Sequence, residues 1–177
     1  MPHKPIVTEP DDTTVVIERT FDAPRQLVWD CWTKAEHIAK WFGPHMMTVP
    51  VAKSDLRPGG EWRIVMRDPN GTDYTGKGVY KEVQAPERFT ATVDVSEHSE
   101  EWFDTIEPGR DRSKGKPHYD LGWDIRFAET KEGKTIVTIR SLFPGKYIRD
   151  RFMKTGMTDG WSQSLEKLDA LLEKIGA

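Results

Sequence analysis

The apolar residues of this chain change their spacing along the sequence, and each change marks an expected element. Residues 14–21 alternate apolar and polar side chains, which is typical of a strand with one buried face. Residues 24–33 and 35–41 carry apolar side chains three and four positions apart, as helices do, and Gly43-Pro44 ends the second helix. The pattern therefore predicts one strand followed by two short helices.

Alternation with a period of two returns after residue 47 and dominates the middle of the chain. Asp68-Pro-Asn-Gly71 supplies the turn of a hairpin, because Pro presets one turn dihedral and Asn-Gly favours positive φ. Six further strands are expected, at residues 48–56, 61–67, 72–83, 88–95, 119–129 and 135–143. Together with the first strand they predict an antiparallel sheet of about seven strands.

The C-terminal part returns to helical spacing. A single long helix is predicted over residues 148–174, with an apolar stripe of Met153, Met157, Trp161, Leu165, Leu168, Leu172 and Ile175. Gly156 and Gly160 interrupt it at about 1 kcal/mol each relative to alanine, which suggests a close backbone approach or space for another molecule. A strongly curved sheet can wrap around such a helix, so the expected fold class is α+β.

Two segments do not fit these patterns. Residues 1–12 are polar and contain prolines, so we expect a flexible N-terminal arm ahead of a single domain at residues 13–177. Residues 96–118 lack alternation and are acidic in the first half and basic in the second, which predicts a loop insertion. The insertion is interpreted as a solvated, mobile loop, with a lid over a site or a partner-binding segment as alternatives.

Composition narrows the class of protein. The 177 residues suit one domain, and Leu, Ile, Val and Phe make up only about a fifth of them, although seven Trp and six Met restore apolar bulk. The net charge of −3 and a pI near 6.0 argue against a nucleic-acid partner. No apolar stretch is long enough for a membrane span, residues 1–12 do not resemble a secretory signal, and the lone Cys31 forms no internal disulfide. A cytoplasmic location is expected.

The sequence offers no set of residues for catalysis or for metal binding. The Gly-x-Ser-x-Gly elbow of hydrolases is absent, and the five histidines lack the spacing of metal ligands, so neither a metal nor another cofactor is expected. Cys31 lies on an apolar helix face and is interpreted as a structural thiol. Glu82 shares strand parity with Tyr80 and is a weak candidate for an acid or base in a dry pocket.

Aromatic residues, methionines and glycines gather on the faces expected to point inward. Plain core packing would explain them, but a core built for stability alone would favour Leu, Ile and Val, whereas this mixture suits a pocket. Gly76 and Gly78 would leave unfilled volume. If that volume is a ligand site, Gly78→Leu should be accommodated, and if it is already packed, the same change should cost ~1–3 kcal/mol of stability. The candidate lining of the cavity is Trp62, Met66, Tyr74, Gly76, Gly78, Tyr80, Trp123, Met153, Met157 and Trp161.

Several short motifs in a fixed order give the chain a family resemblance. They are Arg19-Thr-Phe-Asp-Ala-Pro24, Trp41-Phe-Gly-Pro44, Arg57-Pro-Gly-Gly-Glu-Trp62, Ala85-Pro-Glu-Arg88 and Gly156-Met-Thr-Asp-Gly-Trp161. Over residues 15–175 the chain resembles the START-like (SRPBCC) superfamily and, within it, the branch related to the activator of heat shock protein 90 ATPase. The resemblance implies a helix-grip fold with a cavity between the sheet and the last helix, and a connection with stress response. The segment 96–118 departs from the compact pattern.

Members of this superfamily include lipid carriers, hormone and antibiotic binders, aromatase/cyclases and co-chaperone domains, so the resemblance leaves three hypotheses. The first is binding of a small, largely apolar or aromatic ligand in the cavity, with a hydrophobic small molecule as the partner. The second is an aromatase/cyclase-like enzyme. The third is a co-chaperone-like interaction module whose partner is a chaperone or another protein. A monomer or a homodimer is expected, with no nucleic acid and no membrane span.

Overall fold

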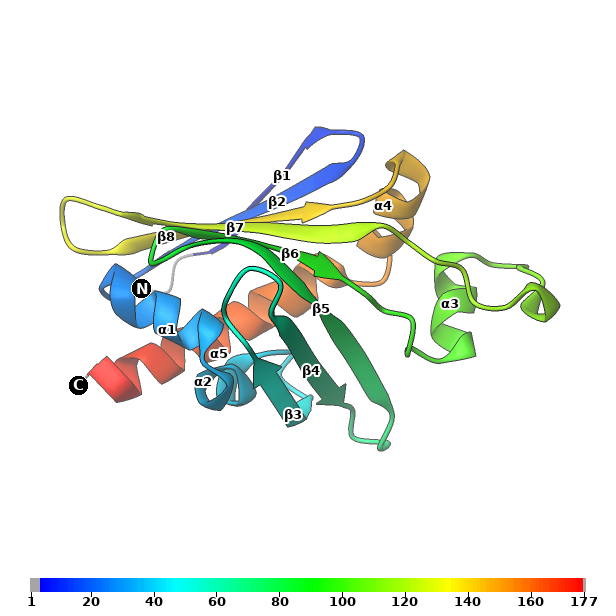
Figure 1. Cartoon of the computed structure of the whole chain (residues 1–177), viewed down its shortest axis with the longest axis horizontal. Coiled ribbons are helices and arrows are strands. Elements are labelled where there is room, and N and C mark those ends of the chain that lie inside the picture. Colours follow the sequence, from blue (N-terminus) through cyan, green and yellow to red (C-terminus); the bar gives the residue numbers. More distant parts are fainter. Residues whose placement is uncertain (1–3, 177) are drawn as a thin grey trace.

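An eight-stranded antiparallel sheet curves around a long helix in the computed structural model, which describes residues 4–176 (Figure 1). The strands are β1 (Ile6–Asp11), β2 (Thr14–Phe21), β3 (Thr48–Ser54), β4 (Glu61–Arg67), β5 (Asp73–Gln84), β6 (Arg88–Val93), β7 (Leu121–Glu129) and β8 (Thr135–Leu142). Their order in the sheet is β1-β2-β8-β7-β6-β5-β4-β3. Strands β3 to β8 therefore form the expected meander, and the β1–β2 hairpin joins it through β8.

The helices lie between and after these strands. They are α1 (Arg25–Thr33), α2 (Ala35–Trp41), α3 (Glu100–Ile106), a 3₁₀ turn η1 (Arg112–Lys114), α4 (Lys146–Met153) and α5 (Met157–Gly176). Figure 1 shows α1, α2 and α5 gathered on one face of the sheet, whereas α3 projects at the end of the molecule away from both termini. This is the α+β, helix-grip arrangement that the sequence predicts. Among the described residues, no helix combines the length and hydropathy needed to cross a membrane.

The core lies between the concave face of the sheet and the helices. Val15, Ile17 and Phe21 alternate along β2 and are fully buried, as the period of two requires. Helix α5 presents Leu165 and Leu168 to them, both at 0% exposure. Burying one such side chain contributes about 1.5–3 kcal/mol, so this contact between sheet and helix adds substantially to the stability of the fold.

A buried cation fixes the position of α5 on the sheet. Arg19 of β2 is 2% exposed, and its guanidinium donates to Asp169 Oδ2 of α5 at 2.9 Å and to the Thr20 carbonyl oxygen at 3.1 Å. The same group lies 4.5 Å from the centre of the Phe21 ring. Because a buried charge is costly without hydrogen-bonding partners, these contacts fix the position of α5 along β2.

The N-terminal arm is the first difference from the expected organisation. Residues Ile6–Asp11 form strand β1 and pair with β2, from Ile6 opposite Glu18 to Asp11 opposite Thr14. The expectation of a loose arm is therefore wrong for this stretch, and the sheet has eight strands in place of about seven. Every residue of β1 is exposed, so it forms an edge with no inward face for hydrophobic alternation to mark. Residues 1–3 of the expected arm lie outside the described part.

The C-terminal helix is also divided where one continuous helix was expected. Helix α4 ends at Met153 and α5 begins at Met157, with Gly156 between them at φ +83°. That backbone conformation favours glycine because it lacks Cβ. The Thr155 amide and hydroxyl both donate to the Phe152 carbonyl oxygen, at 3.1 and 2.6 Å, which closes the last turn of α4. Gly156 therefore lies in the break between the two helices, and Gly160 lies in the first turn of α5.

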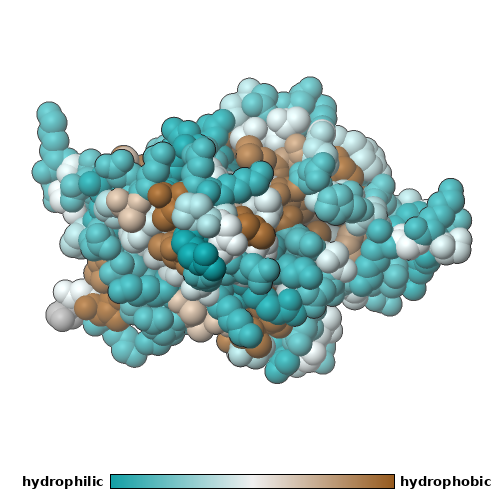
Figure 2. Space-filling view, viewed as in Figure 1, coloured by the Kyte–Doolittle hydropathy of each residue, from teal (hydrophilic) through white to brown (hydrophobic). Residues whose placement is uncertain are grey.

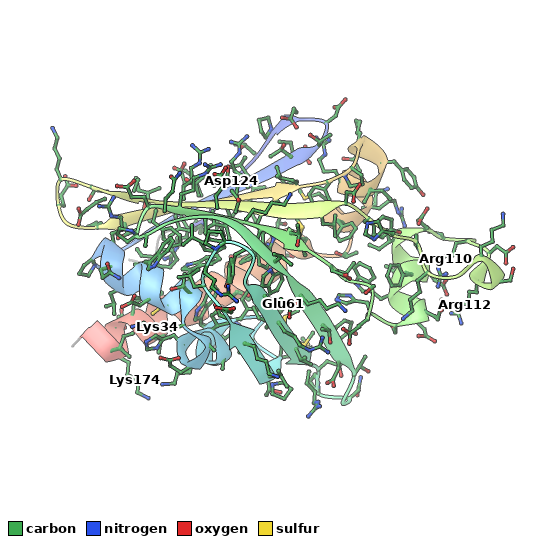
Figure 3. All side chains as sticks on the ribbon, in the orientation of Figure 1. Lys34, Glu61, Arg110, Arg112, Asp124 and Lys174 are labelled. Atoms are coloured by element: carbon green, nitrogen blue, oxygen red, sulfur yellow. The ribbon has the colours of Figure 1, made fainter. Side chains whose placement is uncertain are left out.

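The segment 96–118 is folded and packed against the domain. Ser99 caps α3 by accepting from the Trp102 amide at 3.2 Å, and Phe103 and Ile106 are both 0% exposed. The Arg151 guanidinium of α4 donates to the Ile106 and Thr105 carbonyl oxygens, each at 2.8 Å. The expected solvated loop is therefore wrong for α3, because two fully buried side chains anchor it. The far end of the segment, which carries Arg110 and Arg112, projects beyond α3 and has a hydrophilic surface (Figures 2 and 3).

The two glycines of β5 differ in what surrounds them. A Cβ on Gly76 would lie 3.4 Å from two carbons of the Trp62 ring, whereas a Cβ on Gly78 would lie 1.9 Å from the Thr92 carbonyl oxygen. That carbonyl accepts from Trp62 Nε1 at 3.1 Å. Gly78 thus permits a close backbone approach between β5 and β6 and leaves no unfilled volume. Of the two outcomes expected for Gly78→Leu, the structure therefore contradicts accommodation and agrees with overpacking.

We predict that Gly78→Ala lowers the free energy of unfolding by at least ~1–3 kcal/mol, the usual cost of overpacking. Gly76→Ala is the matched control in the same strand, and it should cost less because its Cβ meets only the flat ring of Trp62. Urea unfolding of both variants measures the difference. Equal midpoints for the two variants would contradict the close approach.

Candidate functional site

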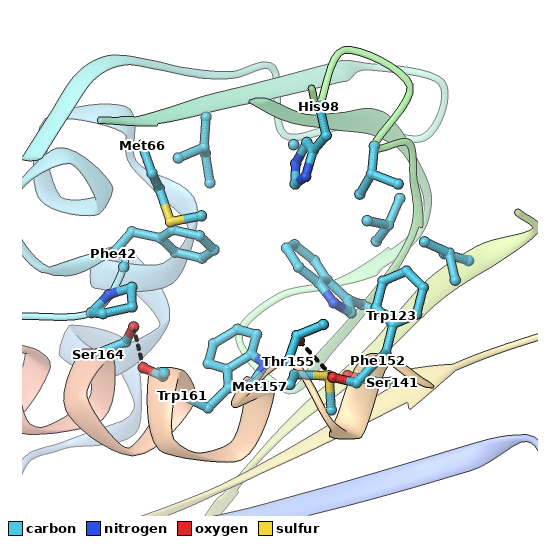
Figure 4. A pocket seen from close by; sticks show the side chains of 18 of the residues that line it. Phe42, Met66, His98, Trp123, Ser141, Phe152, Thr155, Met157, Trp161 and Ser164 are labelled. Carbon is cyan, nitrogen blue, oxygen red and sulfur yellow. Dashed lines mark hydrogen bonds between the residues drawn. The ribbon is translucent and has the colours of Figure 1, made fainter. Parts of the chain in front are cut away.

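A cavity of about 300 Å³ lies between the sheet and the break that separates α4 from α5. Figure 4 shows Met66 and His98 on the sheet side, Met157 and Trp161 on the helix side, and Phe42 and Trp123 between them. The sheet and its connections contribute Phe42, Gly43, Pro44, Trp62, Ile64, Met66, Gly76, Val93, Val95, His98, Trp102, Leu121, Gly122, Trp123, Ser141, Leu142 and Phe143. The helical part contributes Phe152, Thr155, Gly156, Met157, Gly160, Trp161 and Ser164.

The lining has no charged side chain. Among the described residues that line the cavity there is no Asp, Glu, Lys or Arg, and His98 is the one titratable group. Burying an ion without a partner costs far more than burying an apolar group. The cavity therefore suits an uncharged, largely apolar molecule.

Packed aromatic rings form much of the wall. Trp62 of β4 stacks on Trp123 of β7 at 4.8 Å between ring centres and 22° between planes. Trp123 meets Trp161 of α5 edge to face at 6.0 Å, and Phe42 meets Trp161 in the same way at 5.8 Å. These rings join strands that are distant in sequence to the helix. They give the cavity flat, polarisable faces that aromatic ligands prefer.

The loop that follows α2 closes one side of the cavity and is held by α5. Lys167 Nζ donates to the Pro44 carbonyl oxygen at 3.2 Å, and burial lowers the pKa of this lysine. The His45 amide donates to Gln163 Oε1 at 3.1 Å, and His45 Nε2 lies 3.0 Å from a Glu166 carboxylate oxygen. These contacts fix Gly43 and Pro44 as a wall of the cavity.

His98 is a buried polar group in this lining. It is 7% exposed, and its Nδ1 is buried without a hydrogen-bond partner among the described residues. Burial lowers its pKa from 6.5 to about 4, and a hydrogen bond with the Thr75 backbone offsets part of that shift. The imidazole is therefore uncharged at neutral pH.

Six of the ten predicted cavity residues line the cavity. They are Trp62, Met66, Gly76, Trp123, Met157 and Trp161. Tyr80 instead points into the core, where its hydroxyl lies 2.8 Å from Ser54 Oγ, and the Tyr74 hydroxyl donates to Asp68 at 3.5 Å. Gly78 lies at the close approach to β6, and Met153 packs against the core beside the cavity.

Glu82, the weak candidate for an acid or base, lies outside the cavity. Its side chain is 58% exposed and pairs with Arg88 at 2.9 Å. Arg88 also donates to both carboxylate oxygens of Asp124, at 2.9 and 3.0 Å, in the ion-pair network of the outer face (Figure 3). The inward placement inferred from strand parity is wrong because the β5–β6 register shifts between Tyr80 and Val83.

Several lining residues were missed by the reasoning from sequence. His98 and Trp102 belong to the segment expected to be a solvated loop, so their burial had no signal in the alternation. Ser141 is 5% exposed on β8, where its parity with Ile139 places it inward, and this signal was available. Phe42 stands in the Trp41-Phe-Gly-Pro44 motif, which marked it without placing its ring.

Cys31 lies away from the cavity, and the described residues form no metal centre. Cys31 is 0% exposed, and burial raises the pKa of its thiol to about 11, so it stays protonated. Among the described residues, no three His, Cys, Asp or Glu side chains come together in a group that could hold a metal ion.

Comparisons with known proteins agree on the fold. The sequence model of the family described as "Activator of Hsp90 ATPase homolog 1-like protein" matches residues 22–173. A protein from Nitrosomonas europaea is 25% identical, with a TM-score of 0.74 over 93% of this chain and 96% of that one. A protein from Mycobacterium smegmatis is 23% identical, with a TM-score of 0.78 over 98% and 99%. An AHSA1 protein from Silicibacter pomeroyi is 19% identical, with a TM-score of 0.68 over 90% and 97%. Comparison with curated proteins gives no significant match.

The lowered pKa of His98 predicts a loss of stability in acid. As the pH falls from 6.5 to about 4, the unfolded chain takes up a proton on this residue that the folded chain does not. The loss is on the order of 3 kcal/mol and is complete below pH 4. His98→Phe should lack it, so its unfolding free energy should fall less over this window than that of the wild type.

A matched control for this measurement is His118→Phe, because the His118 side chain is 78% exposed. It should keep the full wild-type loss between pH 6.5 and pH 4. Parallel curves for all three proteins, measured by urea unfolding at each pH, would contradict a buried, uncharged His98.

Proposed function

This chain belongs to the family of activator of Hsp90 ATPase homolog 1-like proteins, and from that premise we propose that it binds an uncharged, largely apolar or aromatic small molecule in the cavity. Proteins of the START-like fold commonly bind hydrophobic ligands between the sheet and the last helix. The observation that carries the proposal for this chain is the absence of charged side chains among the described residues of the lining.

Burial provides the binding energy in this proposal. Each Å² of apolar ligand surface removed from water contributes roughly 25 cal/mol, and a cavity of about 300 Å³ is at the lower end of the usual range for small-molecule sites. The faces of Trp62 and Trp123 offer stacking surfaces, and Met66 and Met157 offer flexible side chains that adjust to the ligand. This combination favours a compact ligand with up to three rings.

The enzyme hypothesis receives less support. An aromatase/cyclase-like reaction needs proton transfer at a defined carbon, and general acid–base catalysis needs a titratable group close to the reacting atoms. His98 is the one titratable group among the described lining residues, and Glu82 lies on the outer face. Binding accounts for the site without any further group.

The interaction-module hypothesis depends on an exposed surface. The projecting end of residues 96–118 carries charged side chains that already pair with each other, such as Arg110 Nε with Asp104 at 2.9 Å (Figure 3). Figure 2 shows that end as hydrophilic. A surface of this kind gives a partner protein little apolar area to bury, so the cavity is the better-supported site.

The charge of the ligand can be tested with two related fluorescent probes. N-phenyl-1-naphthylamine is uncharged, and 8-anilinonaphthalene-1-sulfonate has the same rings and a sulfonate. We predict that the uncharged probe binds at least about tenfold more tightly, because the lining offers the sulfonate no ion-pair partner. Fluorescence titration gives both dissociation constants. Equal or tighter binding of the sulfonate would contradict the proposal.

The place of binding can be tested with a matched pair of Val→Phe variants. Val95 lines the cavity, whereas Val79 lies outside it and is 37% exposed. Val95→Phe should fill part of the volume and weaken binding of N-phenyl-1-naphthylamine by about tenfold or more. Val79→Phe should leave the affinity unchanged. The proposal fails if both variants bind the probe as the wild type does while their unfolding midpoints show that they are folded.

A further inference from the structure

Three indole N–H groups of the cavity lining have no acceptor within the described part of the protein. Trp62 Nε1 donates to the Thr92 carbonyl oxygen at 3.1 Å, but the Nε1 atoms of Trp102, Trp123 and Trp161 have no hydrogen-bond partner among the described residues. None of the three is among the described side-chain nitrogens that are both buried and unpaired, so each keeps accessible surface. An indole N–H can only donate. The cavity therefore offers donors whose role is fixed by their chemistry.

Trp123 and Trp161 bring two of these donors together. The centres of their rings are 6.0 Å apart, and their planes are inclined at 70°. One ring comes from β7 and the other from α5, so they face the cavity from the sheet and from the helix (Figure 4). In that view the blue nitrogen of each ring lies on the side nearest Thr155. A carbonyl oxygen has two lone pairs, so one such atom between the rings can accept from both N–H groups.

The side chains of the lining offer few acceptors to set against these donors. Among the described lining residues there is no carboxylate and no side-chain amide. The hydroxyls of Thr155 and Ser164 already donate to carbonyl oxygens of the preceding helical turn, at 2.6 and 2.9 Å. His98 Nδ1 is buried, and Ser141 adds one hydroxyl that can donate or accept. The polar side-chain groups open to a ligand are therefore mainly donors.

A ligand that fills the cavity removes water from these N–H groups, and a donor left without an acceptor costs affinity. A neutral acceptor on the ligand avoids that cost, whereas a carboxylate would enter without a counter-charge. We infer that the ligand is a neutral aromatic carbonyl compound, and that its carbonyl oxygen accepts hydrogen bonds from Trp123 Nε1 and Trp161 Nε1. The inference rests on the proposed function and assigns these two indoles as the groups that orient the ligand.

Two compounds of nearly equal shape test this assignment. 1-Tetralone carries a carbonyl group next to its aromatic ring, and tetralin has a methylene group in its place. Calorimetric titration gives the ratio of the two dissociation constants for each protein, and comparing this ratio between proteins cancels the difference in transfer from water. Trp123→Phe and Trp161→Phe keep an aromatic ring without the N–H. Each should lower the preference for 1-tetralone by about fivefold, the value of one ordinary hydrogen bond.

Trp62→Phe is the matched control, because it is the same substitution in the same lining. The N–H that it removes is already bonded to Thr92, so the preference should stay that of the wild type even where the affinity for both compounds falls. If Trp123→Phe and Trp161→Phe keep the wild-type preference while they bind both compounds, the inference is wrong and the proposed function stands. If neither these compounds nor N-phenyl-1-naphthylamine binds the wild type, both are wrong.

The wild-type protein supplies a readout that needs no variant to fold. An indole proton moves to lower field when its N–H donates a hydrogen bond, so the ¹H–¹⁵N signals of Trp123 and Trp161 should lie at lower field with 1-tetralone than with tetralin. The signal of Trp62, whose N–H is bonded within the protein, should be the same in the two complexes. Equal positions of the Trp123 and Trp161 signals in the two complexes would overturn the inference, whatever the variants show.

Discussion

The shape of this domain depends on the close approach between Gly78 of β5 and the Thr92 carbonyl of β6. With no Cβ in the way, that carbonyl accepts from the Trp62 indole at 3.1 Å, and farther along β5 the register with β6 shifts between Tyr80 and Val83. Interruptions of this kind bend a sheet. Strands β3 to β5 turn away from β6 to β8 here (Figure 1), so the sheet encloses a space that a flat sheet would leave open.

The opposite wall of that space depends on a second departure from regular structure. The break at Gly156 separates α4 from α5, so that Met157 begins a new helix and Trp161 follows one turn later, where it meets Trp123. Arg19 and Asp169 hold α5 on β2 at its other end. The cavity therefore lies between two walls that are each irregular at a glycine. Its uncharged lining follows from the same arrangement, because the charged residues of these strands, such as Asp124, lie on the outer face (Figure 3).

Much of the fold could be predicted from the sequence because most strands have one buried face. The bounds of residues 14–21 and 61–67 agree with β2 and β4 for this reason, and those of residues 35–41 agree with α2 because its apolar residues are three and four positions apart. Strand β1 has no buried face, so its residues gave no alternation. The period of two along the strands predicted that Trp62 and Trp123 point inward, and both line the cavity. The same reasoning failed for Glu82 because the β5–β6 register shifts between Tyr80 and Val83. His98 was missed because its burial depends on packing against Tyr74 of β5 and Trp102 of α3, and no local pattern encodes a contact with a strand more than twenty residues away.

The central claim is that an uncharged aromatic molecule enters this cavity. The seven tryptophans offer a direct test, since each indole N–H gives its own signal in a ¹H–¹⁵N NMR spectrum. Trp102, Trp123 and Trp161 line the cavity, whereas Trp29 and Trp41 do not. Titration with N-phenyl-1-naphthylamine should shift the first three signals progressively and leave the signals of Trp29 and Trp41 in place. Unchanged signals for all three cavity tryptophans at saturating probe would contradict the account.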